Sequence, residues 1–275
     1  MKSYILNLKS LLMRTPLGAI AMEMRWRLGA FHRFRHPELW EMYLEEKRLP
    51  LVLTRLLSSD SCIADVGAHL GSFLRLALRY APHGRHFAFE ASPSKAKWIK
   101  AQFPEVNVFS AAVTARAGVA TFYEDQAYPA NSSLNKLRTG LSTKVVEVPT
   151  VTLDDALADV KRLDLLKLDI EGEELNALCG GLNVIKRLKP AIIFECGTVS
   201  EVDHFSLFHF ITTDLDYRIF GFADFLFDKG PVGFDEFRKY GMYPFRGFNF
   251  VALSSASEQG NDPRACCINQ SAGTG

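Results

Sequence analysis

From residue 61 onward, short apolar segments alternate with segments of helical periodicity, and this alternation constrains the fold more than any other feature of the chain. Short apolar runs are typical of buried strands, whereas apolar residues spaced three to four apart are typical of helices. We expect strands at 62–66, 86–90, 106–113, 119–123, 145–151, 163–170, 191–196, 217–222 and 248–253, and helices at 72–80, 94–103, 153–157, 173–184 and 204–212. Such alternation predicts an α/β domain in which a parallel sheet carries helices on both faces.

The first 60 residues and the last 21 differ from this pattern. Between residues 1 and 37, seven Lys or Arg side chains stand against a single acid, Glu23, a formal balance of +6. Helical spacing of apolar residues predicts two or three short helices, the last at 37–57. We therefore expect a basic, helical N-terminal region (1–60), a central domain (61–254) and a small, polar, disordered tail (255–275). The N-terminal region either packs on the domain or contacts an anionic membrane surface or a lipid-linked substrate.

Composition excludes several classes of protein. The chain carries 32 Lys and Arg against 31 Asp and Glu, so the overall basic field of a nucleic-acid binder is absent and no nucleic-acid partner is expected. No run reaches the ~20 apolar residues of a membrane span, and no signal-peptide cleavage site follows the start. Three of the five cysteines lie in apolar stretches without a C-x-x-C pair, which predicts reduced, buried thiols: Cys62, Cys179 and Cys196. We expect a cytoplasmic protein that also contacts the inner face of the membrane if residues 1–37 bind lipid.

The first candidate site is a glycine-containing turn after the expected strand 62–66. It reads Asp65-Val66-Gly67-Ala68-His69-Leu70-Gly71, and its two glycines let the backbone approach a ligand closely. Ligands of open α/β sheets bind beyond the carboxyl ends of such strands. The G-x-x-x-G spacing differs from the dinucleotide pattern G-x-G-x-x-G, which disfavours a pyrophosphate site. Asp65 also favours a ligand with positive charge; a plain strand–helix turn is the alternative.

The second candidate is a single carboxylate at the end of the next strand. Glu90 follows the run Phe87-Ala88-Phe89, 19 residues after Gly71. A carboxylate at this place accepts hydrogen bonds from both ribose hydroxyls of a nucleoside ligand. Without the glycine turn before it, Glu90 would be interpreted as a surface acid.

The third candidate is a charged cluster within an apolar strand. Lys167 and Asp169 interrupt the run 163–170, and alternation places both on the same side of the strand. Buried charges are costly unless they are paired, and each of these residues offers the other a partner. Glu171 and Glu174 then fall at the mouth of the strand and in the first turn of the next helix. A structural ion network is one interpretation, and an active site at the carboxyl end of a central strand is the other.

Taken together, these motifs resemble the FkbM family of S-adenosylmethionine-dependent methyltransferases. The resemblance spans about residues 60 to 253 and is strongest in the Lys-x-Asp-x-Glu-Gly-x-Glu element. Its other parts occur in the family's order and spacing: 65–71, Phe89-Glu90, Asn131-Ser132-Ser133-Leu134, Thr152-Leu153-Asp154-Asp155 and Ile193-Phe194-Glu195. One departure is His69, where the family usually has Asn.

The resemblance implies a doubly wound, Rossmann-like class I methyltransferase sheet, mostly parallel with an antiparallel last strand, plus the N-terminal helices. It implies an S-adenosyl-L-methionine site that includes Asp65, Gly67, Ala68, His69, Gly71 and Glu90. The family acts mostly on oxygen, commonly on sugar hydroxyls of glycans and glycolipids or on hydroxyls of polyketide-type products.

A neutral alcohol is a poor nucleophile, so methylation of a hydroxyl calls for a base. Asp169 and Glu171 are the leading candidates, with Lys167 orienting Asp169 or polarising the acceptor oxygen. His69 and His204 are the alternatives. A metal route is also open, in which oxygen ligands gather around Mg²⁺: Asp169, Glu171 and Glu195.

The sequence leaves the acceptor open. A sugar or glycolipid O-methyltransferase is the main hypothesis, and an enzyme acting on a non-sugar small molecule is the second. A nicotinamide oxidoreductase and a catalytically inactive cofactor-binding protein are the competitors from other classes. After Asp203, aromatic residues that form either core or an acceptor pocket include Phe205, Phe208, Phe225 and Phe227, with Asp224, Asp228 and Lys229 among them.

Overall fold

A seven-stranded sheet forms the centre of the molecule, for which a computed structural model describes residues 35–36, 39–125, 134, 143–197 and 203–256. The strand order is β3-β2-β1-β7-β8-β10-β9. The strands are β1 (Ile63–Val66), β2 (His86–Phe89), β3 (Asn107–Phe109), β7 (Leu165–Leu168), β8 (Ala191–Glu195), β9 (Tyr217–Gly221) and β10 (Asn249–Ser254). Neighbours are parallel except that β10 runs antiparallel to both β8 and β9. The mostly parallel sheet with an antiparallel last strand is thereby confirmed.

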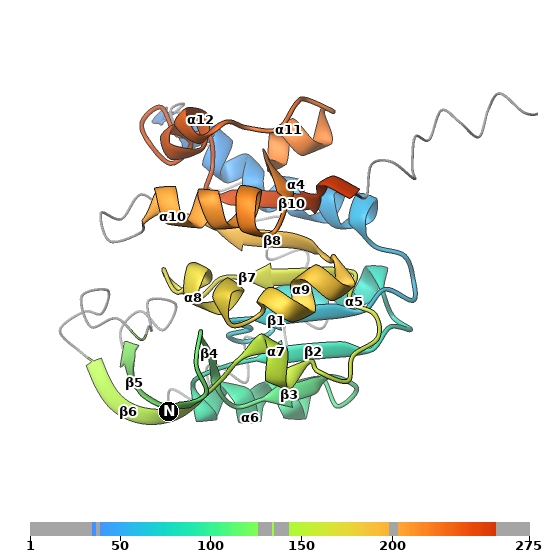
Figure 1. Ribbon diagram of the computed structural model, residues 1–275, viewed down its shortest axis with the longest axis vertical. Helices are drawn as coiled ribbons and strands as arrows, with labels where there is room; N and C mark the ends of the chain where they lie inside the picture. Colours follow the sequence, from blue (N-terminus) through green and yellow to red (C-terminus); the bar gives the residue numbers. More distant parts are fainter. Residues whose placement is uncertain (1–34, 37–38, 126–133, 135–142, 198–202, 257–275) are drawn as a thin grey trace, which may run out of the picture.

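Helices cover both faces of this sheet (Figure 1). Alternate residues of each strand point to opposite faces, so Ala64 and Leu166 join one core cluster while Ile63 and Leu165 join another. The first face is covered by α7 (Leu153–Ala156), α8 (Glu174–Cys179), α9 (Leu182–Leu188), α10 (His204–His209) and α12 (Phe234–Lys239). The second is covered by α4 (Trp40–Leu56), α5 (Ser72–Tyr80), α6 (Pro93–Gln102) and α11 (Phe222–Leu226). The π-helical turn η4 (Phe210–Asp214) extends α10. This two-sided cover is the class I methyltransferase architecture expected above.

A second, three-stranded sheet branches off near β3. It has the order β4-β6-β5, with β4 (Ala112–Val113), β5 (Gly118–Asp125) and β6 (Thr143–Val151). The single strand expected at 106–113 is therefore wrong, because the chain leaves the main sheet after Phe109 and pairs Ala112 with Thr150 instead. Apolar periodicity identifies a strand but not the sheet that it joins.

The helix expected at 173–184 is also wrong, because it is broken into α8 and α9. Gly180 and Gly181 lie at the break, and both approach other elements closely. A Cβ atom at Gly180 would lie 2.3 Å from the carbonyl oxygen of Thr114, and one at Gly181 would lie 2.9 Å from the Leu153 side chain. The paired glycines thus let the chain at this break pack closely on the segment after β4 and on α7.

Helix α4 belongs to the core. Val52 and Leu53 are fully buried against α5 and α11, although the sequence places them in the N-terminal region 1–60. Most of residues 1–37 and the tail from residue 257 lie outside the described residues, so the expected short helices and the disordered tail stay predictions.

Two further findings concern membrane-spanning helices and the cysteines. Within the described part of the chain, no helix is both long and apolar enough to cross a membrane. Cys62 and Cys196 are buried free thiols as expected, but Cys179 is exposed because it lies at the carboxyl end of α8, just before the glycine break.

Candidate active site

The carboxyl ends of four neighbouring strands meet at one pocket with a volume of about 280 Å³. β1, β2, β7 and β8 each contribute residues, as expected for ligand sites in open parallel sheets. The volume is near the lower end of the range for small-molecule sites. The polar residues that line the pocket include His69, Glu90, Lys95, Lys167, Asp169, Glu171, Glu173 and Glu195.

The turn after β1 forms one wall of the pocket. Gly67 and Ala68 both donate their backbone N–H groups to the Phe89 carbonyl at 3.0 Å, which ties the turn to the end of β2. Gly67 has φ +82°, and a Cβ atom there would lie 2.0 Å from the Asp169 carbonyl oxygen. Only glycine therefore lets the ends of β1 and β7 approach this closely.

His69 lies in the same turn, with a left-handed backbone conformation at φ +50°. Asn, Asp and His are the non-glycine residues enriched in this conformation, so the departure from the family's Asn keeps the backbone geometry. The backbone N–H of His69 donates to Glu90 at 2.8 Å. This hydrogen bond thus fixes the position of the Glu90 carboxylate, which comes from the neighbouring strand β2.

Glu90 lies at the end of β2 and is 5% exposed. Its Oε1 accepts the Ser92 N–H at 2.9 Å, and its Oε2 accepts the His69 N–H. Burial raises the pKa of this carboxyl, against the lowering effects of Lys95 and of the two backbone hydrogen bonds. Because a carboxylate offers about four acceptor sites, two remain for a ligand in the pocket.

A line of three charged side chains runs from the pocket into the core. Lys167 Nζ lies 2.9 Å from Asp169 Oδ2 and 3.5 Å from Asp65 Oδ1. The Asp169 side chain is 39% exposed, Lys167 is 12% exposed and Asp65 is fully buried. The strand geometry expected from alternation is confirmed, and Asp65 lies behind the lysine and is not itself among the residues that line the pocket.

The electrostatics of this line keep Asp169 ionised. Burial favours the neutral form of Asp169, but Lys167 and a hydrogen bond from Glu195 outweigh it and lower its pKa. Burial likewise acts against the charge on Lys167, yet the two aspartates raise its pKa. Asp65 has a raised pKa because desolvation exceeds the attraction to Lys167.

The pKa of Glu195, at the end of β8, is raised, whereas that of Asp169 is lowered. Burial raises its pKa first, and the nearby charge of Asp169 raises it further. Glu195 therefore holds a proton with which it hydrogen-bonds Asp169. From sequence, Glu195 is expected only as part of the family resemblance and as a metal ligand, since no pattern indicates which of two neighbouring carboxyls keeps the proton.

The segment after β7 has an unusual backbone. Glu171 adopts φ +57° and Gly172 φ +94°, so two consecutive residues are left-handed. Glu174, which is 4% exposed, supports this turn by accepting the N–H groups of Ile170 at 3.1 Å and Gly172 at 3.2 Å. The last Glu of the motif is thus a support for the turn, whereas Glu171 lines the pocket in a strained conformation of the kind found at functional sites.

Some candidates fall outside the pocket. Gly71 is the N-cap of α5, where a Cβ atom would lie 2.4 Å from the Phe103 ring. His204 hydrogen-bonds the Gly197 carbonyl at 3.0 Å and is not among the lining residues. Of the segment Asn131-Ser132-Ser133-Leu134, the described residue Leu134 lines the pocket and the other three lie outside the described residues. Lys95, in the first turn of α6, is a pocket residue that the sequence analysis missed.

The aromatic residues expected after Asp203 do not form the pocket wall. Phe208 packs partly buried against the core cluster that contains Phe237, and Phe205 and Phe227 are exposed. Asp228 pairs with Arg55 at 2.8 Å, which ties α11 to α4. None of them lines the pocket.

A metal site finds no support in the described part of the chain. There, no three His, Cys, Asp or Glu side chains are grouped so that they could hold a metal ion.

Comparisons with known proteins find one family model and several solved structures. Residues 65–219 match the model of the methyltransferase FkbM domain. Among solved structures, the methyltransferase FkbM from Methylobacillus flagellatus is similar with 16% identity and a TM-score of 0.47 over 72% of this chain and 44% of that one. The present chain thus spans less than half of that protein's length.

Two further solved structures are similar at lower TM-scores. Precorrin-6y C5,15-methyltransferase from Geobacter metallireducens has 17% identity and a TM-score of 0.39 over 64% of this chain and 73% of that one. The Methanococcus jannaschii fibrillarin pre-rRNA processing protein has 13% identity and a TM-score of 0.39 over 72% and 68%. No match is found among curated proteins.

Proposed function

The chain belongs to the FkbM methyltransferase family, and from this premise we propose that it is an S-adenosylmethionine-dependent O-methyltransferase acting on a sugar hydroxyl of a glycan or glycolipid. The observation that carries the proposal is the placement of Glu90 beside the glycine turn of β1, in the lining of a pocket with excess acidic charge. A non-sugar hydroxyl, such as that of a polyketide-type molecule, is the alternative acceptor.

The donor set of the pocket fits this cofactor. Glu90 keeps two acceptor sites for the ribose hydroxyls, and the Gly67–His69 turn brings backbone close to the ligand. Even with Glu195 protonated, four Asp or Glu side chains in the pocket lining stand against two Lys. This excess suits a positively charged sulfonium and opposes the pyrophosphate of a dinucleotide.

The bound cofactor would supply an electrophilic methyl group. In the proposed reaction, Asp169 accepts the acceptor's hydroxyl proton at Oδ1 or Oδ2, because its carboxylate is ionised and partly exposed to the pocket. Lys167 and protonated Glu195 hold Asp169 in place from two sides. Positioning of the acceptor oxygen can contribute up to about 7–11 kcal/mol in favourable cases.

The near-neutral charge of the chain and the acidic pocket support a glycan or other small-molecule acceptor over nucleic acid. The strained Glu171 conformation supports an enzyme over an inactive binding protein, since strain of this kind is costly to maintain without a use.

Replacement of Glu90 by Gln tests the cofactor site. Glu90→Gln is expected to weaken S-adenosylmethionine binding by about 2–4 kcal/mol, since it weakens up to two charge-assisted hydrogen bonds. Isothermal titration calorimetry measures the loss, with NAD as the competing ligand. Unchanged affinity in a folded variant would contradict the ribose assignment.

Gln is preferable to Ala at this position. The sequence predicts that Glu90→Ala leaves folding intact, but the structure shows the carboxylate accepting two backbone N–H groups. Ala would leave both groups without their partner, at a cost of about 1–3 kcal/mol each. The matched control is Glu173→Gln, at a half-buried carboxylate that lines the same pocket and accepts a hydrogen bond from Asn176 rather than from the turn after β1.

The basic segment 1–37 carries a separate proposal, namely contact with anionic lipid. At about 1 kcal/mol per basic residue near such a surface, binding should be measurable and should weaken as salt is added. Co-sedimentation with phosphatidylglycerol-containing vesicles compares the full chain with a truncation that lacks residues 1–37. Equal binding of the two proteins would favour a packing role for this segment.

A further inference from the structure

Three aromatic residues between α12 and β10 form a row at the surface. The ring centroids of Tyr243 and Phe245 lie 6.1 Å apart at an interplanar angle of 89°, and those of Phe245 and Phe248 lie 6.1 Å apart at 45°. Tyr243 is 71% exposed, and the other two are half-buried. Exposed apolar surface of this kind, rimmed by polar groups, marks binding sites. We call Tyr243, Phe245 and Phe248 the aromatic row.

The aromatic row ends beside the pocket. Because β10 is antiparallel to β8, it begins at the edge of the sheet where β8 ends. Asn249 pairs with Glu195 in the strand register, and the Phe248 carbonyl accepts the Cys196 N–H at 2.8 Å. Phe248, at one end of the row, is thus joined through the β8–β10 pairing to Glu195, whose carboxyl hydrogen-bonds Asp169.

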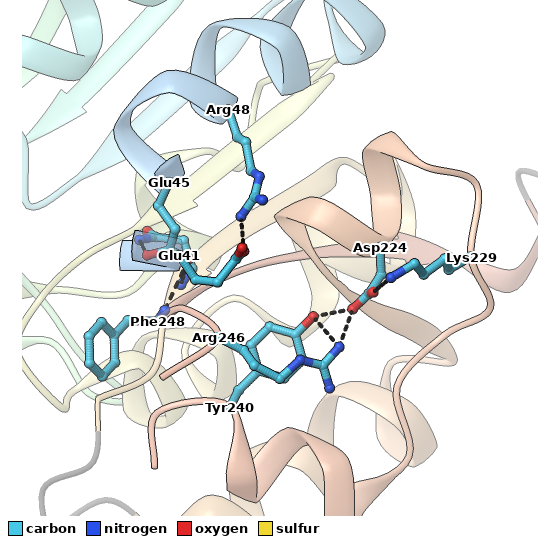
Figure 2. Close-up of polar contacts among 9 residues, drawn as sticks. Glu41, Glu45, Arg48, Asp224, Lys229, Tyr240, Arg246 and Phe248 are labelled. Atoms are coloured by element: carbon cyan, nitrogen blue, oxygen red, sulfur yellow. Dashed lines mark hydrogen bonds and ion pairs between the residues drawn. The ribbon is translucent and has the colours of Figure 1, made fainter. Parts of the chain in front are cut away.

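A buried glutamate fixes the inner end of the row (Figure 2). Glu45 of α4 is 7% exposed and accepts the N–H groups of Phe248 and Asn249, both at 3.0 Å, while the Phe248 ring extends away from it. Gly247 packs directly on this carboxylate, since a Cβ atom there would lie 2.2 Å from Glu45 Oε1. The backbone beneath Phe248 is therefore held by a buried charge.

A second network holds Arg246, which lies between Phe245 and Phe248 in the chain. The Arg246 guanidinium lies 4.3 Å from the centre of the Tyr240 ring and pairs with Glu236 and, at 3.6 Å, with Asp224. The Tyr240 hydroxyl donates to Asp224, which is 3% exposed (Figure 2). The segment is thus anchored at Arg246 and at the backbone of Phe248, yet its aromatic rings stay outside the core. Such pre-organisation lowers the entropy cost of binding a partner.

We propose that the aromatic row binds the sugar ring of the acceptor and presents its hydroxyl to Asp169, an inference that rests on the proposed function. The negative face of an aromatic ring attracts the polarised C–H groups on one face of a pyranose. Arg246 and Glu236, whose side chains are 41% and 46% exposed, flank the row and offer hydroxyl groups the donors and acceptors that their own ion pair leaves over. An apolar chain would gain little from these polar neighbours, and a nucleotide's phosphate would be repelled by the acidic pocket.

Saturation-transfer NMR on the full chain with S-adenosylhomocysteine tests this proposal. The probes are four methyl pyranosides (glucose, mannose, galactose and rhamnose), octyl glucoside below its micelle concentration, and uridine monophosphate. We expect saturation of ring C–H protons for at least one pyranoside. Tyr243→Ala/Phe245→Ala is expected to weaken its apparent affinity about tenfold. Tyr243→Phe, which keeps the ring, should retain binding.

The matched control is Phe227→Ala, at a 68% exposed aromatic residue outside the row. It should bind the pyranoside as the wild type does. The proposal is overturned if no pyranoside is saturated, if the double variant binds as well as the wild type, or if only the octyl chain or the nucleotide gives a signal. Calorimetry of S-adenosylmethionine on the same samples tests cofactor binding separately from acceptor binding. If the cofactor binds and no pyranoside does, the role of the aromatic row is overturned while the proposed function stands.

Discussion

Asp169→Asn is expected to lower methyl transfer at least about 10²-fold while S-adenosylmethionine binding stays within a few-fold of the wild type. The substitution keeps the size of the side chain and removes the ionised carboxylate that faces the pocket. Turnover is measured by transfer of labelled methyl into an accepting extract, and cofactor binding by calorimetry. Near-full turnover would mean that the charge serves only as a partner for Lys167, and the base would then be sought at Glu171 or His69.

Two controls sharpen the result for Asp169. Glu195→Gln replaces a carboxyl that donates a hydrogen bond to Asp169 with an amide that also donates, so it should retain more activity than Glu195→Ala. Adding a chelator to the wild-type enzyme tests the metal route. If activity is lost and Mg²⁺ restores it, Asp169 is a metal ligand and not the base.

Lys167→Met is expected to lower the free energy of unfolding by about 3–5 kcal/mol near neutral pH. The variant leaves Asp65, which is fully buried, without the cation that lies 3.5 Å away. Urea denaturation measures the loss. Asp65→Asn/Lys167→Met, which removes the stranded charge, should recover much of it.

The pH dependence of this variant has a definite sign. Burial already raises the pKa of Asp65, and loss of Lys167 raises it further, so the folded state binds the proton more tightly than the unfolded state. The loss of stability in Lys167→Met should therefore shrink as the pH falls, because Asp65 becomes neutral in both the folded and the unfolded state.

The control is Lys229→Met, at an exposed lysine 3.3 Å from buried Asp224, which keeps Tyr240 and Arg246 as partners. It should cost no more than about 1 kcal/mol. Equal stability of Lys167→Met and wild type at all pH values would contradict the account.

The central strands could be predicted from sequence because they are buried on both faces and so appear as continuous apolar runs. Ile63–Val66 and Leu165–Leu168 are examples, and Lys167 and Asp169, at the end of the second, line the pocket. α11 and α12 were not predicted: they are only five and six residues long and lie in an aromatic-rich stretch without helical periodicity. The sheet that a strand joins, as when Ala112 pairs with Thr150 in the second sheet, depends on contacts that no local pattern contains.

The site shows the same division. The motif predicted that Lys167 and Asp169 pair, because strand alternation alone brings them together. It could not predict that Glu174 supports a left-handed turn or that Glu195 keeps a proton, since both depend on burial and on neighbours from other elements. The role of α4 was equally hidden, because the contact of Glu45 with Phe248 joins residues 203 positions apart.

The measurement that tests the central claim most directly is transfer of a ¹³C-labelled methyl group. The wild-type chain and Asp169→Asn are each incubated with S-[methyl-¹³C]adenosylmethionine and a glycan and glycolipid extract, and the products are examined by ¹³C NMR. The account predicts a labelled O-methyl signal on a sugar carbon with the wild type, and a signal at least about 10²-fold weaker with the variant. Label found only on nitrogen or sulfur, or no incorporation by a wild-type chain that binds the cofactor, would contradict it.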